Sequence, residues 1–201
     1  MSPRQNSRLS ILSLALGFGM SAAAAVASAQ PAAASSPAGT KAGNAGASVP
    51  AADKSWAQKA AVGGMAEVEM GKLAQQKAAN DQVKQFGSHM AEDHSKANNE
   101  LKQIATSKGL ALPTELDATH KSKMAKMEKL SGAQFDRAYM SEMVADHKKD
   151  VAEFRKQSTS GKDGDLKAFA AKTLPTLEDH LKMAQSTDAA VKGGAKASAP
   201  R

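Results

Sequence analysis

Apolar residues recur at steps of three and four through most of the chain after residue 55, which is the spacing of one face of an α-helix. This pattern predicts four long helices and a shorter one between the second and third. The long helices are expected over residues 55–79, 81–108, 132–158 and 165–191. Each of them has about seven turns, so we predict an all-α fold: an antiparallel four-helix bundle about 40 Å long with one short extra helix.

Local signals place the ends of these helices. Ser55 is a candidate N-cap for the first, and Gly109 should end the second. Pro113 and Thr114 are expected to open the short helix, because proline is tolerated at the start of a helix and not in its interior. The turn at 161–164 then separates the last two helices.

Composition supports a helical fold and narrows the chemistry. Of the 201 residues 41% are hydrophobic, yet only 3% are aromatic. Alanine makes up roughly a fifth of the chain, and it is the best helix former. The absence of cysteine excludes disulfide scaffolds, thiolate zinc sites, iron–sulfur clusters and cysteine nucleophiles. Any site must therefore be built from histidine, carboxylates, methionine and hydroxyls.

The amino terminus has the pattern of a signal peptide over residues 1–29. Arg4 and Arg8 are followed by an apolar run, and Ala27-Ser28-Ala29 supplies the small residues that a signal peptidase requires. We expect cleavage after Ala29 and export to the periplasm. No later segment is apolar enough to predict a membrane span once the signal is removed.

The rest of the chain divides by composition into three parts. Residues 30–52 are almost entirely Ala, Pro, Ser and Gly, which predicts a flexible tether. Residues 53–192 carry the helical pattern and should form one bundle domain. Residues 193–201 resemble the tether and are expected to be a disordered tail.

Three of the five histidines directly follow an aspartate, each on the apolar face of a different helix. The pairs are Asp93–His94, Asp146–His147 and Asp179–His180. The segment from Phe86 to His94 also matches the segment from Tyr139 to His147, which indicates a weak internal repeat.

Distance from the turns predicts that Glu67 and three of these histidines lie at one height in the bundle. Glu67 and His94 are equally far from the turn at 80–81, and His147 and His180 are equally far from Gly164. Small residues flank Glu67 on its inner side, so a neighbouring helix can approach closely. These residues are Ala60, Gly63, Gly64 and Gly71.

One carboxylate and three imidazoles form a ligand set suited to iron, manganese, zinc or copper. We therefore predict a metal site at Glu67, His94, His147 and His180. Asp93, Asp146 and Asp179 are expected to be further ligands or acceptors that orient the imidazoles. The alternative is a purely structural buried polar layer that sets helix register. Methionines one turn from each histidine (Met90, Met143, Met183) allow a copper variant, although core packing is the simpler interpretation.

Several segments together resemble a known family. They are Gly63-Gly64-Met65-Ala66-Glu67-Val68, Asp93-His94, Ser131-Gly132-Ala133-Gln134-Phe135-Asp136-Arg137-Ala138-Tyr139-Met140, Asp146-His147 and Thr173-Leu174-Pro175-Thr176-Leu177. This set resembles the bacterial exported family called domain of unknown function 4142. The resemblance implies a ferritin-like fold outside the cytoplasm and no settled activity. Ferritin-type dinuclear sites use Glu-x-x-His, and here Ala91, Val144 and Leu177 stand three residues before the histidines, which favours a mononuclear site.

Charge and the remaining motifs limit the functional hypotheses. The net charge is +7, but lysines alternate with acids, so no nucleic-acid surface is predicted. No catalytic residue is predicted either. The first hypothesis is metal handling or stress protection by the mid-bundle layer. The second is a non-catalytic envelope bundle that binds another envelope protein or a polymer. An oxygen-reactive oxidase is the third.

Overall fold

The computed structural model describes residues 48–197 and contains five α-helices and no strands within that range. Their bounds are α1 (Ala51–Lys77), α2 (Asp81–Ser107), α3 (Ala118–Glu128), α4 (Gly132–Ser160) and α5 (Gly164–Ala197). The all-helical prediction is confirmed for these residues. The predicted signal peptide, most of the predicted tether and the end of the predicted tail lie outside them. No helix in the described part of the chain is long and apolar enough to cross a membrane.

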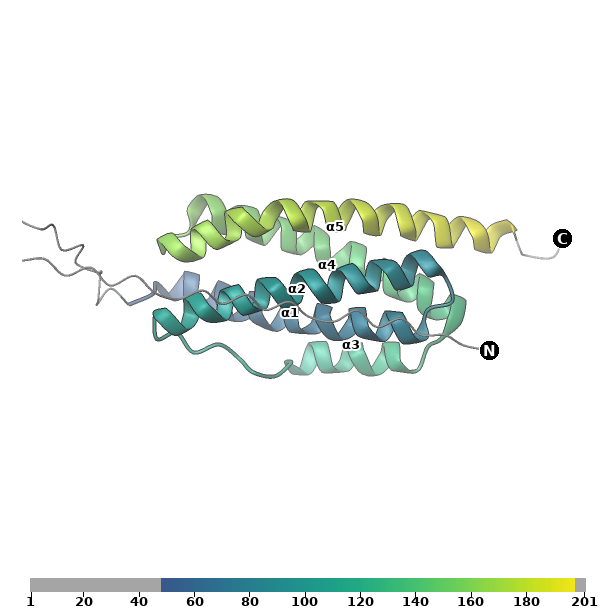
Figure 1. Cartoon of the computed structure of the whole chain (residues 1–201), viewed down its shortest axis with the longest axis horizontal. Coiled ribbons are helices and arrows are strands. Elements are labelled where there is room, and N and C mark those ends of the chain that lie inside the picture. Colours follow the sequence, from purple (N-terminus) through teal and green to yellow (C-terminus); the bar gives the residue numbers. More distant parts are fainter. Residues whose placement is uncertain (1–47, 198–201) are drawn as a thin grey trace, which may run out of the picture. The chain divides into compact units, whose positions relative to one another are not determined.

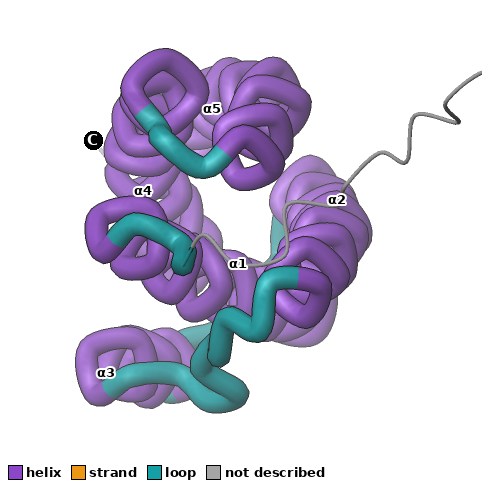
Figure 2. The backbone as a smooth tube through the Cα atoms, turned by 90° about the vertical axis from the view of Figure 1, so that its left-hand side faces the viewer, coloured by secondary structure: helices purple, strands orange, loops and turns teal. Residues whose placement is uncertain are grey.

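The four long helices form a bundle in which each contacts two others. α1 packs along α2 and α4 packs along α5, while the pairs α2–α5 and α1–α4 complete the ring (Figure 1). Seen end-on, α3 lies outside this ring, against α1 and α4 (Figure 2). The connection that contains α3 returns the chain to the opposite end of the bundle, so α2 and α4 run in the same direction (Figure 1).

Several helix ends differ from the sequence prediction. α1 begins at Ala51 after Pro50, so Ser55 is not its N-cap and the predicted tether boundary at 52 is too late. α3 begins at Ala118, because Asp117 caps it by accepting a hydrogen bond from the His120 backbone N–H at 2.8 Å. α5 continues to Ala197, so the predicted tail is helical over 193–197.

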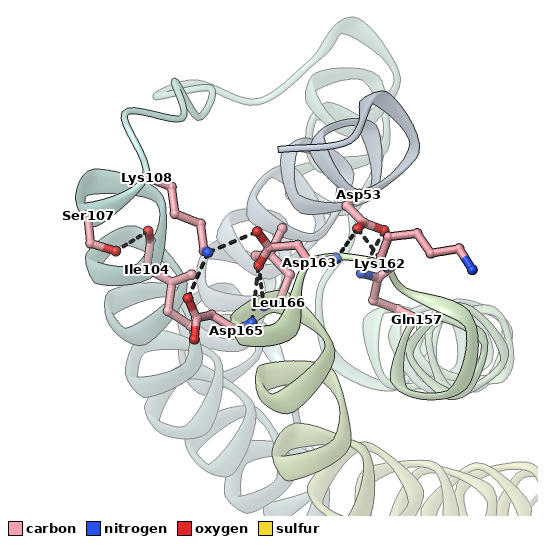
Figure 3. A network of polar contacts seen from close by, with 9 residues as sticks. All are labelled: Asp53, Ile104, Ser107, Lys108, Gln157, Lys162, Asp163, Asp165 and Leu166. Atoms are coloured by element: carbon pink, nitrogen blue, oxygen red, sulfur yellow. Dashed lines mark hydrogen bonds and ion pairs between the residues drawn. The ribbon is translucent and has the colours of Figure 1, made fainter. Parts of the chain in front are cut away.

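Two aspartates hold the bundle together at opposite ends. Asp53, on α1, accepts hydrogen bonds from the backbone N–H groups of Lys162 (2.9 Å) and Asp163 (2.6 Å) in the α4–α5 turn (Figure 3). Asp136, on α4, accepts from the backbone N–H groups of Ala79 (3.1 Å) and Asn80 (3.0 Å) in the α1–α2 turn. Each helix pair therefore binds the turn of the other through a buried carboxylate.

These contacts reveal an internal repeat in which α1–α2 corresponds to α4–α5 at one constant offset along the chain. Under this offset Asp53 matches Asp136, and their partners at 162 and 163 match 79 and 80. Asn80 and Asp163 also correspond, and each accepts from the backbone N–H two residues on, at 2.8 and 3.1 Å. The weak repeat expected from sequence, which pairs Phe86 with Tyr139, is therefore not the one that the fold follows: Phe86 corresponds to Phe169.

Helices α1 and α2 approach closely at two glycines. An added Cβ on Gly71 would lie 2.4 Å from the Gly87 carbonyl oxygen, and one on Gly87 would lie 2.7 Å from the Ala74 Cβ. This confirms the close approach expected beside Glu67. Gly63 is different, because a Cβ there would meet nothing within 4 Å.

The two kinds of glycine predict opposite effects of the same substitution. Gly71→Ala should lower the free energy of unfolding by about 2 kcal/mol, because the new methyl group collides with backbone. Gly63→Ala should raise it by about 0.5–1 kcal/mol, because a mid-helix glycine is replaced without a clash. Urea unfolding of both variants measures the difference, and equal effects would contradict the close helix contact.

Removing either turn-binding carboxylate should destabilise the protein. Asp53→Ala and Asp136→Ala each leave two backbone N–H groups without an acceptor, which should cost about 2–3 kcal/mol in the free energy of unfolding. Asp81→Ala is the control, since its side chain is 91% exposed and its loss should cost less than about 1 kcal/mol. Thermal or urea unfolding of the three variants tests this order.

Candidate metal centre

Each long helix contributes one buried polar side chain to the middle of the bundle. Glu67 comes from α1, His94 from α2, His147 from α4 and His180 from α5, and all four are at most 6% exposed. The structure thus brings together the layer that equal distance from the turns predicts. What this layer binds remains a prediction.

The three imidazoles face one another in a nearly equilateral triangle. Their ring centroids are 5.7 Å (His94–His147), 5.3 Å (His94–His180) and 5.5 Å (His147–His180) apart. One nitrogen from each ring lies within 4.8 Å of the others, so the trio could hold one metal ion. A tetrahedral ion bonded to nitrogen at about 2.0 Å would draw them to about 3.3 Å from one another.

One nitrogen of each imidazole is held by a hydrogen-bond acceptor. His94 Nδ1 donates to Glu67 Oε2 at 2.9 Å, and His147 Nδ1 donates to the Met143 carbonyl oxygen at 3.1 Å. His180 Nε2 donates to Asp93 Oδ2 at 3.1 Å. Glu67 Oε1 is also 3.5 Å from His147 Nδ1. These acceptors fix which nitrogen carries the proton and leave a lone pair on the other.

The remaining nitrogens have no hydrogen-bond partner within the described part of the chain. They are His94 Nε2, His147 Nε2 and His180 Nδ1, and all three are buried. Unpaired buried polar atoms are costly, and fully satisfied networks are the rule in protein interiors. Three buried histidines with one unpaired nitrogen each could hold a metal ion, and acceptors on the opposite nitrogens are the partners that metal-binding histidines usually have.

Burial also keeps these histidines neutral, which is the form that binds metals. Desolvation lowers the pKa of His94 to about 4. Desolvation likewise lowers the pKa of His147 and that of His180, and the neighbouring imidazoles add to the effect. The Glu67 carboxylate opposes the shift of His147 and does not overcome it.

Asp150 is a fifth polar group at the centre, and the sequence analysis missed it. Its carboxyl lies beside Glu67, within hydrogen-bonding reach. Burial raises the pKa of Asp150, and the nearby Glu67 charge raises it further; burial also raises the pKa of Glu67. Both shifts favour the protonated form of each carboxyl. Its position three residues after His147, on the same helix face, is the signal that could have revealed it.

The internal repeat explains this pairing, because Asp150 is the counterpart of Glu67 at the same constant offset. The predicted aspartates behave differently from one another. Asp93 accepts from His180, as expected of a residue that orients an imidazole on another helix. Asp146 instead pairs with Lys123 Nζ at 2.9 Å on α3, and Asp179 is exposed.

The sulfur and phenol groups near the centre belong to the apolar core. Met90 and Met143 are buried among apolar residues, whereas Met183 is 37% exposed. Tyr139 stacks on Phe135 with ring centroids 5.4 Å apart, and its hydroxyl has no partner within the described residues. Burial, and then the neighbouring Glu67 carboxylate, raise the pKa of Tyr139, so it stays protonated.

The lowered pKa of His94 predicts that this residue destabilises the metal-free protein in acid. Between pH 6.5 and pH 4 the unfolded chain binds a proton at this residue and the folded chain does not, so the contribution of His94 to the free energy of unfolding falls as the pH falls. The raised pKa values of Glu67 and Asp150 act in the opposite direction, so the variant is compared with the wild type. His94→Gln should remove about 3 kcal/mol of this fall. Urea unfolding across that range, with a chelator present, measures the slope. His89→Gln, at an exposed position of the same helix, is the control. An unchanged slope in His94→Gln would contradict a buried neutral imidazole.

Comparison with known proteins gives one family and no individual relative. The family model described as Domain of unknown function (DUF4142) matches residues 37–187, a range that includes all five residues of the centre. No curated protein and no solved structure matches the chain. The match covers well over half of the chain and confirms the resemblance found in its motifs. This chain belongs to the DUF4142 family.

Proposed function

We propose that this protein binds one transition-metal ion in the middle of its helical bundle. The ligands are His94, His147 and His180. The observation that carries the proposal is that all three have a buried nitrogen without a hydrogen-bond partner, while the opposite nitrogen of each is held by an acceptor. Imidazole ligands suit zinc, iron and copper, and manganese remains in the set to be tested.

Glu67 supports the site from behind the imidazoles. Its two oxygens contact the Nδ1 atoms of His94 and His147, which are the nitrogens facing away from the proposed ion. A carboxylate in this position makes a histidine more basic and fixes its orientation. A divalent ion would also offset the cost of burying the Glu67 charge.

The arrangement of the helices supports assignment to ferritin-like four-helix bundles. In those folds one long connection joins two antiparallel helix pairs, as the connection containing α3 does here. Glu67 and Asp150 lie on the two first helices of the pairs, where such bundles place one carboxylate each. The Glu-x-x-His carboxylates are replaced by Ala91 and Leu177, so we propose one ion rather than two.

Metal handling or protection against oxidative stress in the periplasm is the role that we propose for this site. The export part of the proposal rests on the sequence of residues 1–29, which lie outside the described structure. The alternative is a purely structural polar layer in an envelope protein that binds a protein or a polymer. The unpaired nitrogens weigh against that alternative, because a structural network gains stability only when its members are satisfied.

The test is metal content and affinity of protein purified without a polyhistidine tag. We expect one equivalent of a transition metal per chain by elemental analysis and a rise in melting temperature when it is restored. His94→Ala, His147→Ala and His180→Ala should each weaken binding on the order of 100-fold or more, and Asp93→Asn about 10-fold. His89→Ala and His120→Ala serve as controls, because neither side chain belongs to the triangle.

Three further results separate the alternatives. If no metal co-purifies and the melting temperature of the wild type is insensitive to added zinc, iron, manganese and copper, the layer is structural. Oxygen consumption on addition of ferrous ion would instead indicate an oxidase. Unchanged cuprous affinity in Met90→Leu and Met143→Leu would exclude thioether ligation.

A further inference from the structure

A cavity of about 520 Å³ lies inside the bundle next to the metal centre. It extends along α1 from Trp56 to Glu67, a span of about 16 Å, and all four long helices contribute to its wall. Its outer rim is formed by Asp117 and His120 at the start of α3 and by Lys149 on α4. Of the three histidines of the triangle only His94 reaches it, so the cavity is a separate space from the proposed metal position.

The internal repeat shows why this end of the bundle is hollow. Ala60 lines the cavity, and its counterpart in the second helix pair is the buried Met143. Thr173 also lines the cavity, and its counterpart in the first pair is the buried Met90. Small residues therefore stand where the other half of the bundle fills its core with methionine. An unfilled interior lowers the stability of the fold. The other helix pair shows that methionine can fill the corresponding positions, so the cavity is retained at a cost in stability, which indicates that it has a function.

The two ends of the cavity differ in chemistry. At the outer end Trp56, Phe154 and Phe169 form an aromatic wall, with ring centroids 5.0 Å (Trp56–Phe154), 6.2 Å (Trp56–Phe169) and 6.1 Å (Phe154–Phe169) apart. At the inner end lie Glu67 and Asp150. Trp56 Nε1 is a buried donor without an acceptor, and Glu67 Oε1 is a buried acceptor without a donor, within the residues described.

We propose that this cavity binds a small uncharged molecule with an aromatic or branched apolar body and one hydroxyl group, the class of phenols and alcohols. The apolar body packs on the aromatic wall, and the hydroxyl donates a hydrogen bond to Glu67 at the inner end. A carboxylate head group is disfavoured because it would be buried beside Glu67 and Asp150. An ammonium group is disfavoured because it would bury three N–H donors where Glu67 Oε1 is the one buried side-chain oxygen without a hydrogen-bond partner among the described residues of the wall. The volume lies in the range of ordinary small-molecule sites between the helices of bundles.

Trp56 is the only tryptophan in the chain and lines the cavity, so its fluorescence reports on occupancy. Four para-substituted toluenes of similar size test the head group: para-cresol, para-methylanisole, para-toluate and para-methylbenzylamine. Titrations are made with the full chain and a chelator present, so the result does not depend on the proposed metal. We expect para-cresol to bind at submillimolar concentration and the other three on the order of ten times more weakly or not at all.

Substitutions that introduce the corresponding residue of the other helix pair test whether the probe binds in this cavity. Ala60→Met and Thr173→Met should fill the cavity, raise the melting temperature and weaken para-cresol binding on the order of tenfold or more. Gly63→Leu should weaken binding likewise, since a side chain there projects into open space at the wall. Gly193→Leu is the matched control, because its Cβ also meets nothing within 4 Å and it does not line the cavity.

Three outcomes would overturn the proposal. The first is the absence of any fluorescence change with para-cresol in folded wild-type protein. The second is tighter binding of the carboxylate or the amine, which would assign a different ligand class. The third is equal binding by Ala60→Met, Gly63→Leu and wild type, which would place the probe elsewhere. None of these results bears on the metal titrations, so the two proposals fail independently.

Discussion

Burial of polar side chains between four helices is the constraint on which the rest of this structure depends. No water shell compensates Glu67, His94, His147 and His180, so each polar atom must be paired within the protein or with something that it binds. The outer nitrogens are paired with Glu67, Asp93 and the Met143 carbonyl. The opposite nitrogens have no partner among the described residues, and this asymmetry supports the proposed metal site over a structural network.

Precise placement of these groups requires a rigid frame, which the paired aspartates provide. Asp53 and Asp136 each bind the turn of the opposite helix pair, so the two pairs are locked at both ends of the bundle. Lys108 adds a further link by pairing with Asp163 at 2.9 Å and Asp165 at 2.7 Å at one of these ends (Figure 3). Between the locked ends the repeat has diverged: one half of the interior is packed with methionine and aromatic residues, and the other retains a cavity.

Much of the fold and the central layer could be predicted from sequence because both follow from local periodicity. Helical spacing located the four long helices, and equal distance from two turns brought His94 beside Glu67 and His147 beside His180. Asp150 was not predicted, because its role depends on its neighbour Glu67 across the bundle and not on a position in an apolar stripe. Asp53 and Asp136 were not predicted for the same reason, since the backbone N–H groups that they bind are more than 50 residues away in the chain. Ser55 and Pro113 were wrong as helix starts because Pro50 and Asp117 supply the actual N-terminal boundaries.

Periodicity and turn positions in the sequence were enough to specify the helical class, the approximate extents of the long helices and the height at which four polar side chains meet. These properties depend on the rise per residue and on the positions of turns, which are local quantities. Three features follow from the packing of the helices alone: which nitrogen of each imidazole is unpaired, the position of Glu67 behind the rings, and the hollow at one end of the interior. Such features depend on side-chain orientation and on volumes shared by several helices, and no single segment of the chain specifies them.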